Sequence, residues 1–215
     1  MGNPFSNPAE LLFLLPTLLV AITVHEFAHA WTADHLGDPT PRIQGRLTLN
    51  PLAHLDPIGT LAIILSGFRF GWGKPVQFDP YNLENPRRDA AIISFAGPLA
   101  NLSLAVLSSI IAHISLSQQL NPFLTAIAIQ FIALNLSLAV FNLIPIHPLD
   151  GGKILVGLLP RHNANEVDKV LNQYGFIMLL ALVLPVFGQP IIWQILGPIV
   201  TMLLHFLVPP GAIFT

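Results

Sequence analysis

Long apolar stretches with almost no charge are the feature that most constrains how this chain folds. Of its 215 residues, 53% are hydrophobic and only 9% are Asp, Glu, Lys or Arg, whereas about a quarter are charged in soluble domains. A helix needs about 20 mostly apolar residues to cross a bilayer. The sequence therefore predicts an all-α polytopic membrane protein with about five (four to six) transmembrane segments. The candidate stretches cover about 8–36, 89–116, 122–142, 174–187 and 191–208.

Proline is unusually frequent for such a chain. There are 20 prolines in 215 residues, against about 5% in average proteins. Proline interrupts helices, and interrupted backbone persists in a bilayer only where it is buried in protein or lines a watery cavity. We expect Pro98 to break the second apolar stretch, and Pro145 and Pro148 to open the backbone after the third.

The basic residues indicate an orientation. All nine Lys and Arg residues lie within 42–88 or 153–169. The apolar segment 58–68 would span only about 16 Å as a helix, so we expect it to be re-entrant rather than crossing. Both basic regions then share one face, which the positive-inside rule makes cytoplasmic. This predicts a multi-pass protein of a prokaryotic plasma membrane, with its N-terminus outside.

Residues 42–49 alternate between polar and apolar side chains. This period of two is typical of a short strand or hairpin. We therefore expect a small β-hairpin between the first apolar stretch and segment 58–68.

The first apolar stretch contains the motif His25-Glu26-Phe27-Ala28-His29, an HExxH. Residues four apart on a helix differ by about 40° around its axis, so both imidazoles face one way and can bind one zinc ion. Glu26 is then placed to deprotonate an activated water. Three ionisable groups in hydrocarbon are costly without a function, which favours a catalytic site over structural histidines.

A catalytic zinc needs a third protein ligand, and Asp150 is the best candidate. It follows the third apolar stretch in a segment rich in proline and glycine, on the same side as the histidines under the predicted orientation. His35 and Asp34 lie on other faces of a continuous helix, so we expect them to be boundary residues.

Other polar residues on the predicted cytoplasmic side have no assigned role. His54 and Asp56 are loop residues that can also line the site, and His147 lies three residues before Asp150.

With these residues in place, the chain resembles the site-2 protease family of intramembrane zinc metalloproteases. The resemblance rests on the HExxH motif, on residues 142–151 (Asn-Leu-Ile-Pro through Leu-Asp-Gly) and on residues 96–101 (Ala-Gly-Pro-Leu-Ala-Asn). It covers about residues 8–160. It implies one zinc per chain, bound by His25, His29 and Asp150.

The resemblance also implies roles for residues that do not bind the metal. Glu26 would be the general base, and Asn142 would position the substrate or stabilise the oxyanion. An edge strand over Gln44–Leu49 would pair with an unwound substrate, as in β-augmentation. Candidate substrate-binding residues are therefore Gln44, Gly45, Arg46, Leu47, His54 and Asn101.

We expect a single membrane-embedded domain over residues 1–215, with a catalytic core at 8–160 and C-terminal helices at 174–208. It would be a compact form without a PDZ insertion or a regulatory domain. The expected partners are a transmembrane protein substrate and the lipid bilayer, not nucleic acid. Two alternatives remain: a membrane zinc hydrolase of the prenyl-protein protease type, and a non-enzymatic metal-binding membrane protein.

Overall fold

The computed structural model describes residues 8–65, 73–185 and 190–210, and this part of the chain is helical. An isolated antiparallel bridge joins Leu55 to Gly73. The α-helices are α1 (Pro8–His35), α2 (Thr40–Ile43), α3 (Pro57–Leu65), α4 (Pro86–Ser117), α5 (Pro122–Asn142), α6 (Asp150–Leu158), α7 (Arg161–Val183) and α8 (Ile191–Leu207). Two short 3₁₀ helices, η1 (Pro51–Ala53) and η2 (Pro80–Asn82), lie in the connections.

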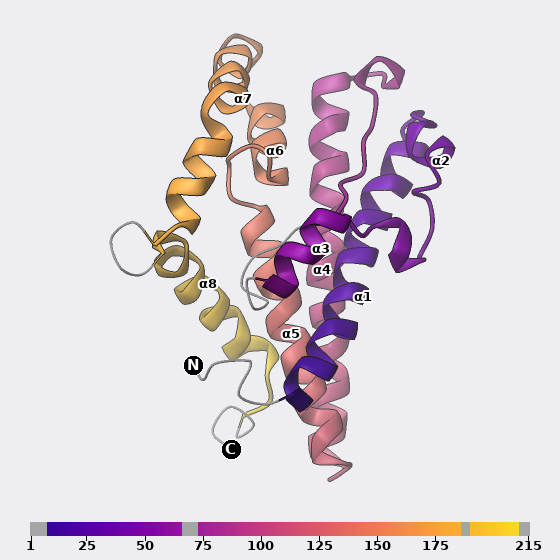
Figure 1. Cartoon of the computed structure of the whole chain (residues 1–215), viewed down its shortest axis with the longest axis vertical. Helices are drawn as coiled ribbons and strands as arrows, with labels where there is room; N and C mark the ends of the chain where they lie inside the picture. Colours follow the sequence, from indigo (N-terminus) through magenta and orange to yellow (C-terminus); the bar gives the residue numbers. More distant parts are fainter. Residues whose placement is uncertain (1–7, 66–72, 186–189, 211–215) are drawn as a thin grey trace.

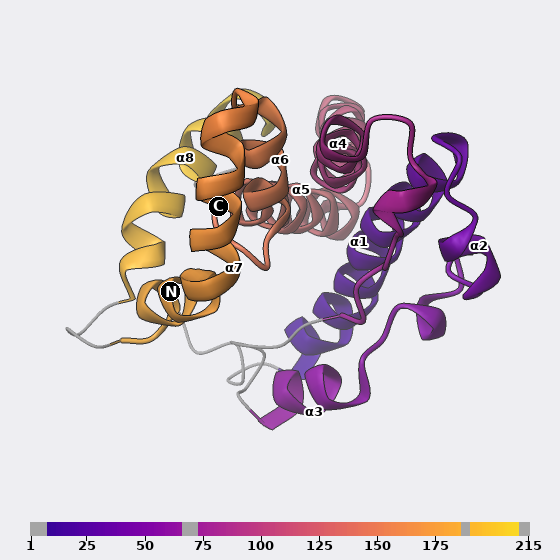
Figure 2. The same cartoon turned by 90° about the horizontal axis from the view of Figure 1, so that it is seen from above.

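Helix α4 is the centre of the bundle. It packs against α1, α5, α6 and α8, so helices from both ends of the sequence meet on it (Figures 1 and 2). Alanines at the interface let α4 and α5 approach closely, because their side chains are small. The core cluster here consists of Ala105, Ala112, Ala128, Ile132, Leu136 and Val208.

Three of the described helices, α1 (from Leu14), α4 and α5, are long and apolar enough to cross a membrane. Helix α8 is also apolar but has only 17 residues. Large apolar side chains point outward from the bundle; Val106, Leu107 and Ile110 of α4 are each about half exposed. Such a surface is unfavourable in water and favourable in lipid. The chain is therefore an integral membrane protein, while the number of about five spans remains a prediction.

The C-terminal boundary differs from the expected one. The polar stretch around 161–169 and the apolar stretch that begins near 174 belong to one helix, α7. No proline or glycine breaker separates the two parts before Gly175, so the helix continues from the polar region into the apolar one.

Segments from both basic regions lie at one end of the molecule. Helix α2 and the start of α4 come from the first region, and α6 and the start of α7 come from the second (Figure 1). The turn that joins α4 to α5 lies at the opposite end. This arrangement agrees with the placement of both basic regions on one face.

The hairpin expected at residues 42–49 is wrong. Residues 40–43 form α2, and turns follow it, with Gly45 in the left-handed region at a φ of 68°. The Asp38 carboxylate accepts hydrogen bonds from the backbone N–H and the hydroxyl of Thr40, and Pro41 follows in the first turn. These local bonds form a turn, and the fixed φ of Pro41 suits the first helical turn, so a helical start is favoured over an extended strand.

The Asp38 carboxylate also joins α1 to a distant loop. It accepts hydrogen bonds from the Asp79 backbone N–H and the Asn82 side chain, at 2.7 and 2.8 Å. Burial alone would raise the pKa of Asp38, but these bonds and those from Thr40 hold that pKa below its usual range. The end of α1 is thereby attached to the segment that leads into α4.

Helix α3 covers nine residues, about 14 Å at 1.5 Å per residue. The described part of this helix is shorter than a bilayer crossing requires, and the re-entrant course of 58–68 remains a prediction. Residues 66–68 of the predicted re-entrant segment lie outside the described residues.

Pro98 does not break its helix, contrary to expectation, because α4 runs through it from Pro86 to Ser117. Proline has no N–H to donate to the Ser94 carbonyl, so the preceding turn is loosened rather than ended. In that same turn, the Ile93 carbonyl accepts a hydrogen bond from His29.

Candidate metal centre

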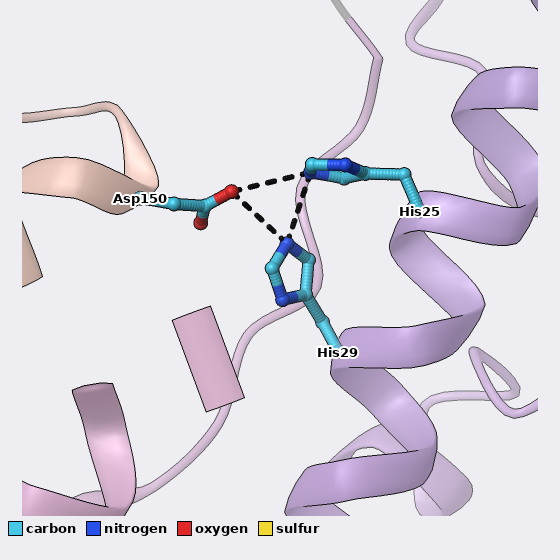
Figure 3. Close-up of side chains that lie close together, drawn as sticks. All are labelled: His25, His29 and Asp150. Carbon is cyan, nitrogen blue, oxygen red and sulfur yellow. Dashed lines mark hydrogen bonds and ion pairs between the residues drawn. The ribbon is translucent and has the colours of Figure 1, made fainter. Parts of the chain in front are cut away.

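Three side chains from two helices, α1 and α6, converge on one point. His25 and His29 lie one turn apart on α1, and Asp150 is the first residue of α6 (Figure 3). The two imidazole Nε2 atoms are 3.0 Å apart. Asp150 Oδ2 lies 3.2 Å from Nε2 of His25 and 3.3 Å from Nε2 of His29. Both histidines are buried.

For each histidine, the hydrogen-bond partner of Nδ1 determines whether Nε2 carries a proton. His29 Nδ1 lies 2.7 Å from the Ile93 carbonyl, which can only accept, so Nδ1 carries the proton. His25 Nδ1 lies 2.6 Å from Asn101 Oδ1. The Asn101 amide nitrogen donates to the Ala21 carbonyl, which orients the amide oxygen toward His25. Each neutral imidazole therefore turns an unprotonated Nε2 toward Asp150.

This donor set fits a zinc ion. Two nitrogen lone pairs and a carboxylate facing one another repel unless a cation lies between them. Asp150 Oδ2 is buried and has no hydrogen-bond partner among the described residues. Zinc–ligand distances of about 2.0–2.1 Å place tetrahedral ligand atoms about 3.3 Å apart, close to the observed separations. Three protein ligands leave the fourth position for water or substrate.

The loop after α5 sets the position of Asp150. Helix α5 ends at Asn142, as predicted, and an irregular segment leads to α6. A Cβ on Gly151 would lie 2.3 Å from the Ile144 carbonyl oxygen, so only glycine permits this close approach. The tight packing places Asp150 in the first turn of α6.

Glu26 faces a backbone donor from the segment before α4. Its Oε2 accepts a hydrogen bond of 2.9 Å from the Val76 N–H. We call residues 73–78 the crossing segment. The Lys74 N–H donates to the His54 carbonyl at 2.9 Å, which fixes the start of this segment.

Two of the predicted substrate-binding residues form hydrogen bonds within the protein. Arg46 is buried and donates to the carbonyls of Ala53 and Lys74. His54 is fully buried, with Nε2 2.8 Å from the Thr48 carbonyl oxygen. These two residues hold the loops around the crossing segment, and substrate contact by them remains a prediction.

Asn101 is also fully buried. Besides contacting His25, it donates to the side-chain oxygen of Asn135 on α5 at 2.9 Å. Asn101 was predicted to bind substrate; in the structure it orients a histidine of the metal centre. Gln44, Gly45 and Leu47 lie at the end of α2 and in the turns after it. Asn142 donates a hydrogen bond to the Leu138 carbonyl of its own helix.

The remaining candidates lie outside the cluster. Asp34 forms an ion pair with Arg42, and His35 Nδ1 donates to the Trp31 carbonyl, as expected for boundary residues. Asp56 accepts a hydrogen bond from the Gly59 N–H at the start of α3. His147 Nε2 lies 3.2 Å from the Asp168 carboxylate on α7.

Comparison with known proteins decides the family. The sequence pattern of peptidase family M50 matches residues 107–182. YwhC of Bacillus subtilis is 39% identical over 197 residues, which cover 88% of this chain and 89% of that protein. Rip2 of Mycolicibacterium smegmatis is 32% identical over 190 residues, 85% of this chain and 70% of that protein. Their names mark both as predicted zinc metalloproteases.

The chain belongs to peptidase family M50. Zinc metalloprotease MJ0392 of Methanocaldococcus jannaschii is a more distant relative, 27% identical over 83% of this chain and 42% of that protein. No solved structure matches the chain significantly. Membership of this family, the membrane-spanning helices and the cluster of His25, His29 and Asp150 identify the protein as a membrane zinc metalloprotease.

Two backbone contacts in the site of this M50 protease could not be predicted from its sequence. The Val76 N–H and the Ile93 carbonyl are backbone groups, so residue identity carries no signal for them. Asn101 did carry a signal, because a polar residue within an apolar stretch needs a buried partner. Its partner, His25, is 76 residues away in the sequence and only the fold reveals it.

Proposed function

We propose that this M50 protease is an intramembrane endopeptidase that hydrolyses peptide bonds within or near transmembrane segments of membrane proteins. The observation that carries the proposal is the position of the donor cluster. Two of its members, His25 and His29, lie buried on a helix that is long and apolar enough to span a bilayer. A transmembrane segment in the same bilayer lies beside such a site, so the position favours membrane proteins as substrates.

We further propose that His25, His29 and Asp150 are the zinc ligands. A zinc ion bound there would activate a water for attack and polarise the scissile carbonyl. Asn101 and the Ile93 carbonyl orient the two imidazoles, and such partners raise ligand basicity.

Glu26 is the proposed general base. The Val76 N–H holds Oε2, so Oε1 remains available to accept a proton from the attacking water. The same carboxyl group then delivers the proton to the leaving amine, which leaves as a neutral group. The hydrogen bond to Val76 keeps the carboxylate in one position throughout.

The substrate must unwind before it is cut, because peptide bonds in a helix are hydrogen-bonded and covered by side chains. The turns at 44–47 offer no strand edge for pairing. The crossing segment is better placed to pair with an unwound chain, since its backbone contacts the general base. Asn142 uses one amide hydrogen on Leu138, and the second remains for the oxyanion.

For the whole chain, we propose one catalytic domain with its core at residues 8–160. It would reside in a prokaryotic plasma membrane with the active site toward the cytoplasmic side. The shared end of the two basic regions supports this orientation.

Two substitutions test the proposed chemistry in purified protein. Glu26→Gln should retain one zinc per chain and abolish cleavage of a transmembrane peptide, because only the base is lost. Asp150→Asn should lower the zinc content, because a neutral amide is a weaker ligand. Zinc is measured by elemental analysis and cleavage by mass spectrometry.

Lys169→Met on α7 provides a control that leaves the cluster intact. Wild-type rates in Glu26→Gln would disprove the role of the base. Unchanged zinc content in Asp150→Asn would remove that residue from the ligand set.

A further inference from the structure

A cleft opens beside the metal centre on the end of the molecule that carries the basic segments. It has a volume of about 970 Å³ and lies between the crossing segment, the start of α4 and the α6–α7 pair. Two of its lining residues connect it to the catalytic groups. Val76 binds Glu26 through its backbone, and Lys153 lies one helical turn after Asp150. The cleft is therefore adjacent to the segment that contacts Glu26 and to the helix that begins with Asp150.

Lys153 is a cation without an acidic partner in the cleft. Its Nζ lies 4.6 Å from the ring centroid of Phe78, a cation–π contact with the crossing segment. Among the described residues it forms no ion pair. Of the described residues that line the cleft, Asp168 alone carries a carboxylate, and it is paired with His147.

Two carboxylates near the cleft act on Lys153 electrostatically. Burial lowers the pKa of Lys153, while Asp150 and Glu26 oppose that change. A carboxylate that entered the cleft would likewise stabilise the charged form of this partly buried side chain.

A second cation strengthens the positive character of the cleft. Arg87, at the start of α4, also lines it and forms no ion pair among the residues that the structure describes. Two basic groups facing one cavity, with its single carboxylate already paired, favour an anionic ligand.

We propose that Lys153 is a specificity-determining residue that binds a carboxylate of the substrate, close to the scissile bond. This inference rests on the proposed function and names a chemical preference of that same site. One helical turn separates Lys153 from Asp150, so the bound carboxylate lies within about three residues of the cut, at roughly 3.3 Å per residue of extended chain. The carboxylate belongs to an Asp or Glu side chain or to a free C-terminus.

Cleavage of matched peptides by the zinc-loaded, detergent-solubilised protein tests the proposal. One transmembrane peptide is prepared with Glu, Gln or Lys at each of the three positions on either side of the cut. At one position, wild-type kcat/KM should be roughly tenfold or more higher for Glu than for Gln, as expected for a hydrogen bond to a charged group. A peptide that ends at that position, with a free or an amidated C-terminus, distinguishes the two sources of the carboxylate.

Substitutions at Lys153 then assign the preference. Lys153→Met should remove it, Lys153→Arg should retain it, and Lys153→Glu should reverse it in favour of the Lys peptide. Zinc content is measured for each variant, and Lys169→Met, an exposed lysine on α7 outside the cleft, should keep the wild-type preference.

The outcomes separate this inference from the proposed function. If the wild type cleaves none of the peptides, the proposed function fails. If it cleaves them without preferring Glu at any position or a free C-terminus, the inference is overturned even when no variant folds. A uniform fall in kcat for Lys153→Met, with the preference unchanged, also overturns it, because Lys153 would then act on the reaction and not on substrate choice.

Discussion

At the scale of single residues, the metal centre depends on partners that select which imidazole nitrogen faces inward. The side-chain oxygen of Asn101 accepts a hydrogen bond from Nδ1 of His25, while its amide nitrogen donates to the oxygens of Ala21 and Asn135. Its three contacts join α1, α4 and α5 at one buried point. The zinc site is therefore prepared by a residue that does not itself reach the metal.

The first prediction concerns this partner. Asn101→Ala should weaken zinc binding by about 10–100-fold, the usual cost of losing such an orienting group. Competition with a chelator of known affinity measures the change. Asn101→Asp retains an acceptor for His25 and should bind zinc more tightly than the alanine variant.

Ser103→Ala is the matched control, since Ser103 is exposed on the same helix and its hydroxyl bonds only the Leu99 carbonyl. Equal zinc affinity in Asn101→Ala and wild type would show that His25 is oriented by other means.

At the scale of elements, the packing of α4 against α1 decides whether the two histidines fit. Gly97 lies directly opposite them. A Cβ at this position would be 2.4 Å from His29 Nε2 and 2.7 Å from His25 Cε1. The absence of a side chain on α4 thus provides the space in which the imidazoles converge.

The second prediction follows from this contact. Gly97→Ala should displace both rings and cause loss of most bound zinc and of cleavage, because the new methyl group occupies their place. Gly197→Ala on α8 adds the same methyl group where nothing lies within 4 Å, and it should behave like wild type. Zinc content and peptide cleavage are measured for both variants. Full zinc binding by Gly97→Ala would mean that α4 can move away from α1.

At the scale of the whole molecule, the distribution of charge relates the bundle to the membrane. The segments rich in basic residues lie at one end, and the turn between α4 and α5 lies at the other (Figure 1). The catalytic groups lie on the half of α1 nearer the basic end, since His25 and His29 belong to its C-terminal part. Together with the positive-inside rule, this arrangement supports the proposed orientation, with the active site toward the cytoplasm.

The third prediction tests this orientation. The chain contains no cysteine, so single-cysteine variants report on one position each. Ser117→Cys, at the end of α4, should react with a membrane-impermeant thiol reagent in intact cells. Glu84→Cys, in the loop before α4, should react only after the membrane is permeabilised. The reverse labelling pattern would contradict the proposed topology.

Features that depend on residues close together in the sequence could be predicted. Apolar length predicted the spanning helices α1, α4 and α5, and the four-residue spacing of His25 and His29 predicted one shared face. The proline- and glycine-rich segment indicated Asp150. Local alternation failed at 42–49, where the turn that Asp38 forms with Thr40 and the left-handed Gly45 favour a short helix and turns.

The helical membrane fold and the identity of the metal-site candidates were therefore determined by the sequence alone, because length, hydropathy and helical spacing act over a few turns of one chain segment. Only the tertiary structure decided which groups surround them. The contacts of Asn101 with His25, Val76 with Glu26, and Lys153 with Phe78 each join residues 50 or more positions apart. No local period encodes such contacts; they arise when packed helices and connecting loops bring distant groups together.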